Sequence, residues 1–389
     1  MQLGCTAQTS AYAFNMTVPD VRQPASVSGG SACPVPARQL TAAGSIALRW
    51  STALGSNPAT ILTQAQTAAA QLAELQLVIA TALSVWTGVS GTTLSPTALA
   101  PVSQTTTASA CGTDGINSLC FNQADMAFTP GVLAFTRVVT ADVIGEQLGG
   151  SAVSVQPGQI LDADIYFNPG DPMITFATPP ALPASPKSYD LESILTHELG
   201  HFFGFSHSAI WSAMMFPYAR VPGTYASPRP SAQQPDAPLG DDDRTGLRVL
   251  YPDPSDTVHT GAIQGHVLPA NPISLPVAPP GVTGIFGAQV VAVNAATGSI
   301  AAGTIGGWSC SLPGPTQFDG SFAIAKLAVG QSYLVYAEPL NGAVESTEID
   351  NAISTLCRNT STDAGWPPLL SCMVPPVDSG FTVRTWPGP

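Results

Sequence analysis

The sequence predicts an α+β protein in which a twisted sheet with helices is followed by a small β-sandwich. Two segments carry apolar residues at helical spacing, one within residues 57–87 and one within residues 188–203. Elsewhere, short apolar runs alternate with polar residues and are separated by turns rich in glycine and proline, which is typical of β-strands. With 389 residues, the chain is long enough for two or three domains with buried cores.

We expect the chain to divide into four parts. Residues 1–44, rich in serine, glycine, proline and threonine, form a loosely structured lead-in. Residues 45–252 form the first domain, residues 253–260 a linker, and residues 261–389 the β-sandwich.

The first domain begins with a strand at residues 45–52, which is followed by a long helix. Asn57 provides the N-cap of this helix and Pro58 its first position. The apolar stripe of the helix favours burial in the core over a binding surface. It comprises Ile61, Leu62, Ala65, Ala69, Leu72, Leu75, Ile79, Leu83 and Trp86. Further strands are expected at residues 118–122, 133–140, 160–168 and 173–178.

A second helix is expected to begin at Ser188, whose hydroxyl can cap it. Asp190 and Glu192 in its first turn suit the positive end of the helix dipole. Gly204 should end the helix, because glycine readily takes the left-handed conformation that a sharp exit needs.

This second helix carries the candidate chemistry of the chain. His197 and His201 are four residues apart, so their imidazoles project from one helical face. The exit at Gly204 can return His207 toward them, and Glu198 lies beside the first histidine. Three neutral imidazoles with a fourth position open to water describe a catalytic zinc site.

Each feature has a simpler interpretation when taken alone. Many helices contain H-E-x-x-H by chance, and a methionine such as Met215 more often fills space in a core. Here, however, three of the five histidines of the chain fall in one motif with a glycine between them. The order of the residues therefore favours a metal site.

The full pattern H-E-x-x-H-x-x-G-x-x-H resembles the signature of the metzincin zinc peptidases. Met215 follows His207 by eight residues and precedes Phe216 and Pro217, an order that is similar to the methionine turn of the matrixin branch. Residues 239–251 look like the closing helix of matrixin catalytic domains, and residues 162–167 resemble a strand of their sheet. The resemblance covers residues 46–252.

The resemblance implies a role for each matching residue. His197, His201 and His207 would hold Zn²⁺, Glu198 would be the catalytic base, and Met215 would lie beneath the metal. Pro217, Tyr218 and the proline-rich loop of residues 219–240 would line an apolar substrate pocket, and residues 173–178 would be the edge strand that pairs with a peptide substrate. Ca²⁺ ligands are conceivable among four aspartates, although solvated loop carboxylates explain them more simply: Asp125, Asp162, Asp164 and Asp171.

The last part of the chain shows strand patterns at residues 261–267, 287–293, 318–324, 332–337 and 380–385. Together they resemble the carboxypeptidase regulatory-like domain, a small β-sandwich of secreted bacterial proteins. His259 and His266 are interpreted as ordinary surface or strand residues.

The composition excludes several partners. The net charge of −13 and the presence of only two lysines argue against nucleic acid and against an anionic membrane surface. The longest apolar stretch, near residues 65–86, contains Gln71, Glu74 and Gln76, so no membrane span is expected. Nothing in the sequence indicates an oligomeric state.

The cysteines indicate an oxidising compartment, because two pairs lie close in sequence. These are Cys111 with Cys120 and Cys357 with Cys372, while a pair of Cys5 with Cys33 would leave Cys310 unpaired. Alternatively, the Cys-x-Val-Pro run at Cys33 could block the metal, as a cysteine does in matrixin zymogens. Residues 1–5 lack the pattern of a signal peptide, and we expect a secreted, extracellular protein of bacterial type.

Three functions remain open at this point. A secreted zinc endopeptidase acting on proteins or peptides fits the motif best. A zinc-binding but catalytically idle surface adhesion protein is the alternative from another class, and the intact Glu198 counts against it. An enzyme restricted to one protein substrate is the third.

Overall fold

The computed structural model describes seventeen stretches of the chain. They are residues 14–16, 39, 48–50, 68–94, 111–112, 114–121, 128, 131–140, 159–168, 175–178, 188–220, 224, 228–269, 283–307, 309, 319–340 and 384–386, with only the backbone described at some of these positions.

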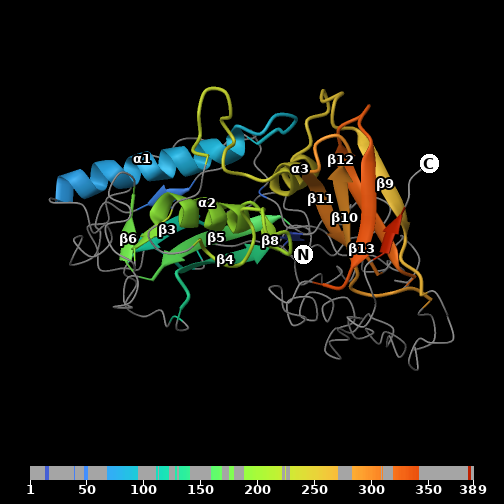
Figure 1. Ribbon diagram of the computed structural model, residues 1–389. Helices are drawn as coiled ribbons and strands as arrows, with labels where there is room; N and C mark the ends of the chain where they lie inside the picture. Colours follow the sequence, from blue (N-terminus) through green and yellow to red (C-terminus); the bar gives the residue numbers. More distant parts are fainter. Residues whose placement is uncertain are drawn as a thin grey trace, which may run out of the picture.

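A four-stranded sheet lies at the base of the first part of the molecule (Figure 1). Its order is β2 (Arg49–Trp50), β3 (Ser118–Phe121), β5 (Ile160–Phe167) and β4 (Ala134–Thr140). The first three strands are parallel, and β4 runs antiparallel to β5 along one edge. The strands predicted at residues 118–122, 133–140 and 160–168 are therefore confirmed.

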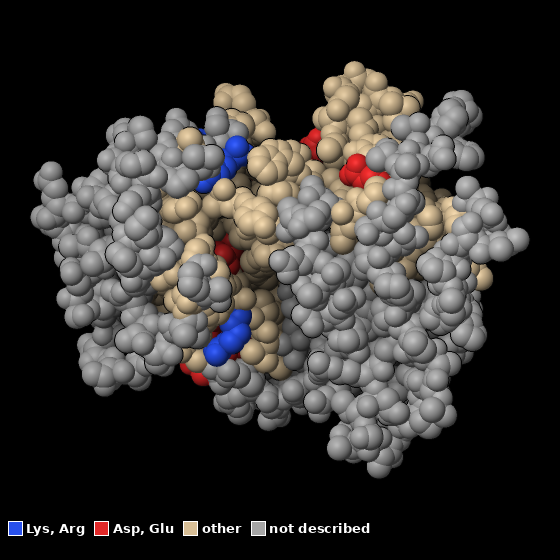
Figure 2. All heavy atoms as spheres, turned by 60° about the horizontal axis from the view of Figure 1, so that its bottom comes forward, with Lys and Arg blue, Asp and Glu red and all other residues tan. Residues whose placement is uncertain are grey.

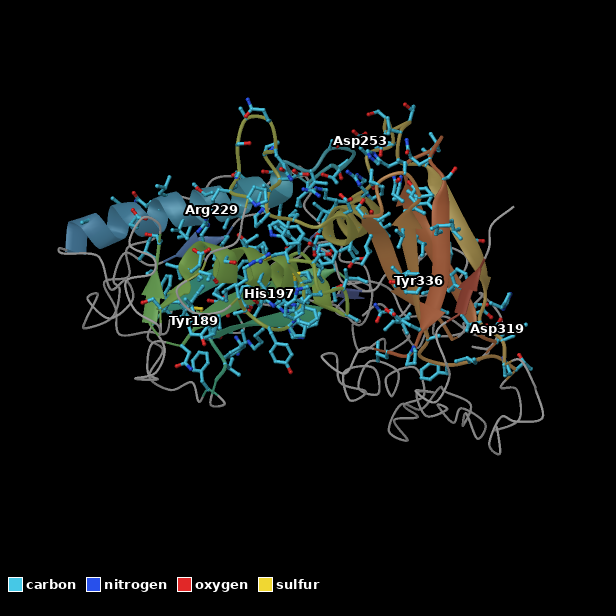
Figure 3. All side chains as sticks on the ribbon, in the orientation of Figure 1. Tyr189, His197, Arg229, Asp253, Asp319 and Tyr336 are labelled. Atoms are coloured by element: carbon cyan, nitrogen blue, oxygen red, sulfur yellow. A yellow bond between two sulfur atoms is a disulfide. The ribbon has the colours of Figure 1, made fainter. Side chains whose placement is uncertain are left out.

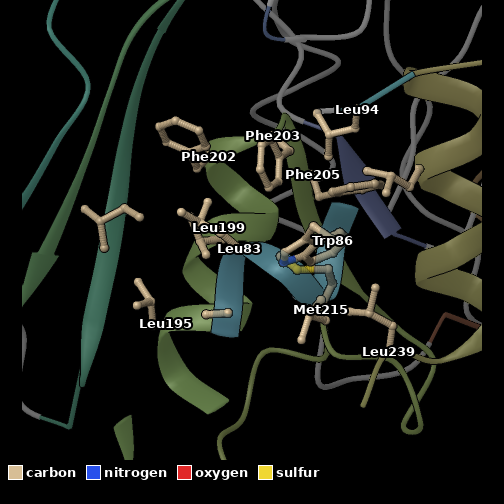
Figure 4. Close-up of a cluster of buried hydrophobic side chains, with 14 of the residues drawn as sticks. Leu83, Trp86, Leu94, Leu195, Leu199, Phe202, Phe203, Phe205, Met215 and Leu239 are labelled. Carbon is tan, nitrogen blue, oxygen red and sulfur yellow. The ribbon is translucent and has the colours of Figure 1, made fainter. Parts of the chain in front are cut away.

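Helix α1 (Ala68–Thr87) packs on helix α2 (Leu191–Phe202), on the side away from the sheet (Figure 1). The fully buried Trp86 of α1 joins them, because its indole N–H donates to the carbonyl of Thr196 at 2.9 Å. Its ring stacks on Phe205 at 5.3 Å between centroids (Figure 4). The predicted start of α1 at Asn57 lies outside the described residues. No helix within those residues is long and apolar enough to cross a membrane.

Helix α2 starts later than the sequence suggests. Ser188 belongs to the short strand β7 (Ser188–Asp190), so the cap position falls to Asp190, whose side chain makes no capping hydrogen bond. The carboxylate of Asp190 instead pairs with Arg229 at 2.8 Å. The predicted cap at Ser188 was wrong because strand pairing extends the chain there. The end was predicted correctly, since Gly204 follows α2 with φ +104°.

A strand is present within residues 173–178, but it lies apart from the main sheet. The segment at residues 173–178 contains β6 (Thr175–Ala177), which pairs in parallel with β7 outside the four-stranded sheet. The edge strand that contacts α2 is β4. Strand order depends on pairing between distant segments, which local patterns do not report.

Helix α3 (Asp241–Leu250) closes the first part of the chain and ends at Tyr251, as predicted. Its cap position is Gly240 rather than Asp241 or Asp242. The side chain of Asp243 accepts the N–H of Gly240 at 2.8 Å, which satisfies the start of the helix. In Figure 1, α3 lies between the four-stranded sheet and the C-terminal strands.

The C-terminal strands form two antiparallel sheets. One has the order β11 (Ile300–Ile305), β10 (Gln289–Asn294), β13 (Tyr333–Glu338) and β14 (Arg384–Trp386), and the other pairs β12 (Ser321–Leu327) with β9 (Gly261–His266). Strand β11 was not predicted. A turn at residues 294–298 connects β10 to it. Gly298, with φ +72°, lies at the end of that turn.

The lead-in segment contributes a strand of its own. Backbone pairing joins β1 (Phe14–Met16) to β8 (Phe205–Ser208), the strand that carries His207. The expectation of a loose lead-in was therefore wrong for these three residues.

One hydrophobic core runs through both parts of the molecule. It contains buried side chains of α1, α2 and the sheet, and it continues through α3 to Ala292, Ala302, Ile324 and Leu327. Figure 4 shows the portion around Trp86 and Met215. Because these C-terminal residues belong to the same core, the C-terminal strands pack on the first part directly.

Gly200 offers a test of the packing between α2 and Met215. Alanine normally stabilises a helix interior relative to glycine, by about 1 kcal/mol. A Cβ at Gly200, however, would lie 3.0 Å from both the Met215 methyl group and the Trp86 ring, and closer still to the Met215 sulfur. We expect Gly200→Ala to destabilise the metal-free protein by about 1–3 kcal/mol in urea unfolding, as overpacking does.

The control is the same change in a Met215→Ala background, where the sulfur is gone. There Gly200→Ala should cost less, because contacting residues couple in a double-mutant cycle. An equal cost in both backgrounds would contradict this contact.

Candidate metal centre

The three histidines of the motif converge. His197 and His201 project from α2, and the turn at Gly204 brings His207 of β8 back against them. Their ring centroids are 4.9 to 5.4 Å apart, and one ring nitrogen from each lies within 4.8 Å of the other two. Among the described residues, they are the one group of histidine, cysteine, aspartate and glutamate residues that could hold a metal ion.

Backbone carbonyls orient two of the rings. Nδ1 of His197 lies 2.8 Å from the carbonyl oxygen of Met214, and Nδ1 of His201 lies 2.7 Å from that of Phe205. A carbonyl oxygen only accepts hydrogen bonds, so each Nδ1 carries the proton. The lone pair of each ring is therefore on Nε2, which is the arrangement of zinc-binding histidines with a hydrogen-bonded outer nitrogen.

Burial keeps these two histidines neutral. It lowers the pKa of His197 to about 3, with the neighbouring His207 adding to the effect. The pKa of His201 is well below its usual value for the same reason, with His197 and His207 adding to it. A neutral imidazole is the form that binds a metal, so the residues present fit zinc.

Glu198 is buried next to the histidines and is only 4% exposed. Burial raises its pKa to about 7, and a hydrogen bond from Thr136 opposes that rise. The hydroxyl of Thr136, in β4, lies 2.6 Å from Oε2 of Glu198 and 3.1 Å from the Glu198 carbonyl oxygen. Thr136 was not predicted, because no motif marks it and its contact with Glu198 depends on β4 lying beside α2.

Met215 is fully buried and packs against Gly200 of α2, the residue before His201. Its turn is held from α3. The carboxylate of Asp243 accepts the N–H groups of Met214 and Met215 at 2.7 and 3.2 Å, besides that of Gly240. Because Met214 also binds His197, Asp243 supports the histidine through this turn.

Pro217 and Tyr218 follow the methionine turn, and Tyr218 is 66% exposed. Its ring forms a row with two others. The ring centroid of Phe216 lies 5.9 Å from that of Tyr218 and 4.8 Å from that of Trp211. Trp211 is 79% exposed. This aromatic row was not predicted, although three aromatic residues within eight positions were a visible signal.

Arg229, in the loop after the methionine turn, is held away from the histidines. It pairs with Asp190 and Glu192 at the start of α2. Figure 3 shows Arg229 on the α1 side of α2 and His197 on the other. Of the described atoms visible in Figure 2, most are uncharged. The apolar pocket itself stays a prediction.

The predicted disulfide between Cys111 and Cys120 is present. Asp164 lies beside it, accepts N–H groups of Gly112 and Ser118, and pairs with Arg137 at 3.1 Å. These partners give Asp164 a structural role. Of the other candidate calcium ligands, Asp162 accepts the N–H of Asp114, while Asp125 and Asp171 lie outside the described residues, as do the remaining five cysteines.

The two histidines interpreted as ordinary residues have protein partners. Nδ1 of His259 lies 3.0 Å from an oxygen of Asp256, and Nδ1 of His266 lies 3.1 Å from the carbonyl oxygen of Asp319. Neither histidine belongs to the group formed by His197, His201 and His207.

The family comparison agrees with this geometry. Residues 127–252 match the family model of the matrixins. This part of the chain is therefore similar to matrixin catalytic domains, and its three histidines could hold a metal ion. The matched range contains β4, β5, the histidine-bearing α2 and β8, the methionine turn and α3, whereas α1 lies outside it.

The raised pKa of Glu198 predicts a stability effect in the metal-free protein. Its folded pKa of about 7 exceeds the ordinary 4.5, so the native state binds the proton more tightly than the unfolded state. The contribution of Glu198 to stability is therefore lost as pH rises from about 4.5 to 7. With that charge removed, Glu198→Gln should be up to about 3 kcal/mol more stable than the parent at pH 8, and less than about 1 kcal/mol more stable at pH 5.

Urea unfolding with a chelator present measures this difference at both pH values. Thr136→Val, which removes the opposing hydrogen bond, should destabilise the parent further at pH 8 but have less effect in the Glu198→Gln background. Thr136→Ser keeps the hydroxyl and serves as the control. A difference between Glu198→Gln and the parent that is the same at pH 5 and pH 8 would contradict the raised pKa.

Proposed function

We propose that this protein is a zinc-dependent metalloendopeptidase that hydrolyses peptide bonds in proteins or peptides. The observation that carries the proposal is the convergence of three imidazoles with one nitrogen each within 4.8 Å of the others. Two of them, His197 and His201, are neutral and are oriented by backbone carbonyls. His197, His201 and His207 are the proposed zinc ligands. Glu198, buried beside them, is the proposed catalytic base.

The chemistry divides between the metal and the chain. A zinc ion bound by three histidines lowers the pKa of its water to about 7 and polarises the substrate carbonyl. Glu198 accepts the proton of the attacking water on its carboxylate and then donates it to the leaving amine. A carboxyl whose pKa lies near 7 can do both at neutral pH.

Thr136 fits both protonation states of Glu198. Its hydroxyl has one hydrogen, but it lies within hydrogen-bond distance of two oxygens of Glu198. While Glu198 is ionised, Thr136 donates to its carboxylate. Once Glu198 is protonated, the carboxylic acid donates to the Thr136 oxygen, and the Thr136 hydrogen turns to the backbone carbonyl. The side chain of Glu198 thereby keeps its position through the proton cycle.

A peptide substrate is proposed to bind along β4. Within the described residues, β4 pairs only with β5, so its other edge offers backbone hydrogen-bonding groups to an extended chain. Pro217, Tyr218 and the loop that follows are proposed to form the side-chain pocket. An apolar preference is expected there, since Arg229 is paired elsewhere.

Several broader features belong to the same proposal. A secreted, extracellular location of bacterial type suits the disulfide and the low content of charged residues. The two C-terminal sheets are compatible with a carboxypeptidase regulatory-like sandwich after a linker at residues 253–260. The latency role of Cys33 and the calcium sites stay predictions, as does an adhesion protein with an idle site, against which the intact Glu198 counts.

Two substitutions separate catalysis from metal binding. Glu198→Gln keeps the size of the side chain but removes the base, so zinc should still bind while peptide cleavage falls by about 10²–10⁴-fold. His201→Ala removes a ligand and should lose zinc and cleavage together. Zinc content and cleavage of a mixed peptide library measure both effects. Wild-type protein that binds zinc but cleaves no peptide, with Glu198→Gln indistinguishable from it, would favour the idle site.

A further inference from the structure

The strand that carries His207 continues into a loop that packs against the C-terminal sheet. Residues 209–214 connect His207 to the methionine turn. Within this loop, Ile210 and Ala213 are buried against Val291 of β10. Partly buried side chains of Val293, Ile300 and Tyr336 surround this contact, and Figure 3 shows Tyr336 in the C-terminal sheet.

A polar contact joins the same regions through α3. Asp242 is fully enclosed, and one of its carboxylate oxygens accepts the hydroxyl hydrogen of Ser208 at 2.8 Å. The other accepts the N–H of Gly303 in β11 at 2.8 Å. Ser208 directly follows His207, and its own oxygen accepts the N–H of Ile210 at 3.0 Å.

These contacts also satisfy the free edge of the C-terminal sheet. Strand β11 is an edge strand of its sheet. Its N–H at Gly303 and its carbonyl at Ala301 are bonded by Asp242 and by the hydroxyl of Thr245, both from α3. An edge covered in this way does not pair with other chains. The loop of residues 209–214, called the metal loop below, and the C-terminal sheet are thus attached to the same helix, α3, and to each other.

We propose that the C-terminal sheet is a structural part of the zinc site, and that Ser208, Asp242 and Val291 act as positioning residues that hold His207 in place for the metal. Ser208 and Asp242 fix the backbone immediately after His207. Val291 fixes the loop between His207 and Met215. The proposal rests on zinc binding by the three histidines, but it does not rest on peptide cleavage.

Val291 has a matched control in its own neighbour. Val290 is the same residue type, is equally enclosed, and lies on the opposite face of β10, because successive residues of a strand face opposite sides. Val290 is not part of the cluster around Ile210. Val291→Ala and Val290→Ala therefore remove the same atoms from the same strand, but only Val291→Ala loosens the metal loop.

Ser208 has a matched control in Thr245. Both residues are buried, and each hydroxyl donates one hydrogen bond that joins α3 to another element. The Ser208 bond joins β8 to α3, and the Thr245 bond joins α3 to β11. Ser208→Ala breaks the link between His207 and Asp242, whereas Thr245→Val breaks only a link between α3 and β11.

The experiment measures zinc affinity of the full chain by competition with a fluorescent chelator, together with stability in urea. Val291→Ala and Ser208→Ala should each weaken zinc binding by about 10-fold, as loss of supporting contacts around a metal ligand does. Val290→Ala and Thr245→Val should leave zinc affinity unchanged, even where they lower the stability of the protein in urea. Asp242→Asn, which retains an acceptor for Gly303, should weaken zinc binding less than Asp242→Leu.

Two results would overturn the proposal. One is unchanged zinc affinity in both Val291→Ala and Ser208→Ala. The other is an equal loss of affinity in each variant and its matched control, which would reflect general destabilisation. Should Val291→Ala fail to fold, the comparison of Ser208→Ala with Thr245→Val decides. A zinc-binding protein that shows the predicted differences but cleaves no peptide would refute the proposed function and leave this inference standing.

Discussion

Two hydrogen bonds from imidazole to backbone determine what this molecule can do. Nδ1 of His197 and Nδ1 of His201 are each committed to a carbonyl oxygen, at Met214 and Phe205. The bonds fix the tautomers, so that the lone pairs on Nε2 point to one place. Burial makes protonation of the rings costly. A group of buried lone pairs without protons is unfavourable by itself, and a divalent cation is the partner that satisfies it.

The rest of the fold keeps those two carbonyls and the third histidine in position. Met214 is held by Asp243 of α3, and Phe205 stacks on Trp86 of α1. Asp242, the neighbour of Asp243, accepts hydrogen bonds from the hydroxyl of Ser208, which directly follows His207, and from the N–H of Gly303 in the C-terminal sheet. Burial raises the pKa of Asp242 to about 7, and the adjacent Asp243 adds to this. Two adjacent buried carboxyls are costly to ionise, and the four backbone N–H groups that donate to them offset part of that cost.

The sequence predicted the features that depend on local spacing. Histidines four residues apart on a helix, followed by a glycine with positive φ, lead to the observed convergence of His197, His201 and His207. The disulfide of Cys111 with Cys120 and the closing helix at residues 241–250 are local in the same sense.

Features that depend on distant pairing were not predictable in the same way. The edge position of β4, and with it the contact of Thr136 with Glu198, depends on strand order. The N-cap of α2 is Asp190 and not Ser188, because Ser188 pairs with Thr175 of β6, a segment that the apolar spacing of the helix does not reveal. Strand β11 was not predicted because its alanines and glycine show little apolar–polar alternation, and it is held largely by β10 and α3.

The most direct test of the central claim is a titration of the chelator-treated protein with Zn²⁺, recording peptide cleavage at each addition. Cleavage should be absent without metal and should rise linearly to saturate at one zinc per chain. Cleavage that persists in the metal-free protein, or none at one bound zinc per chain, would contradict the account.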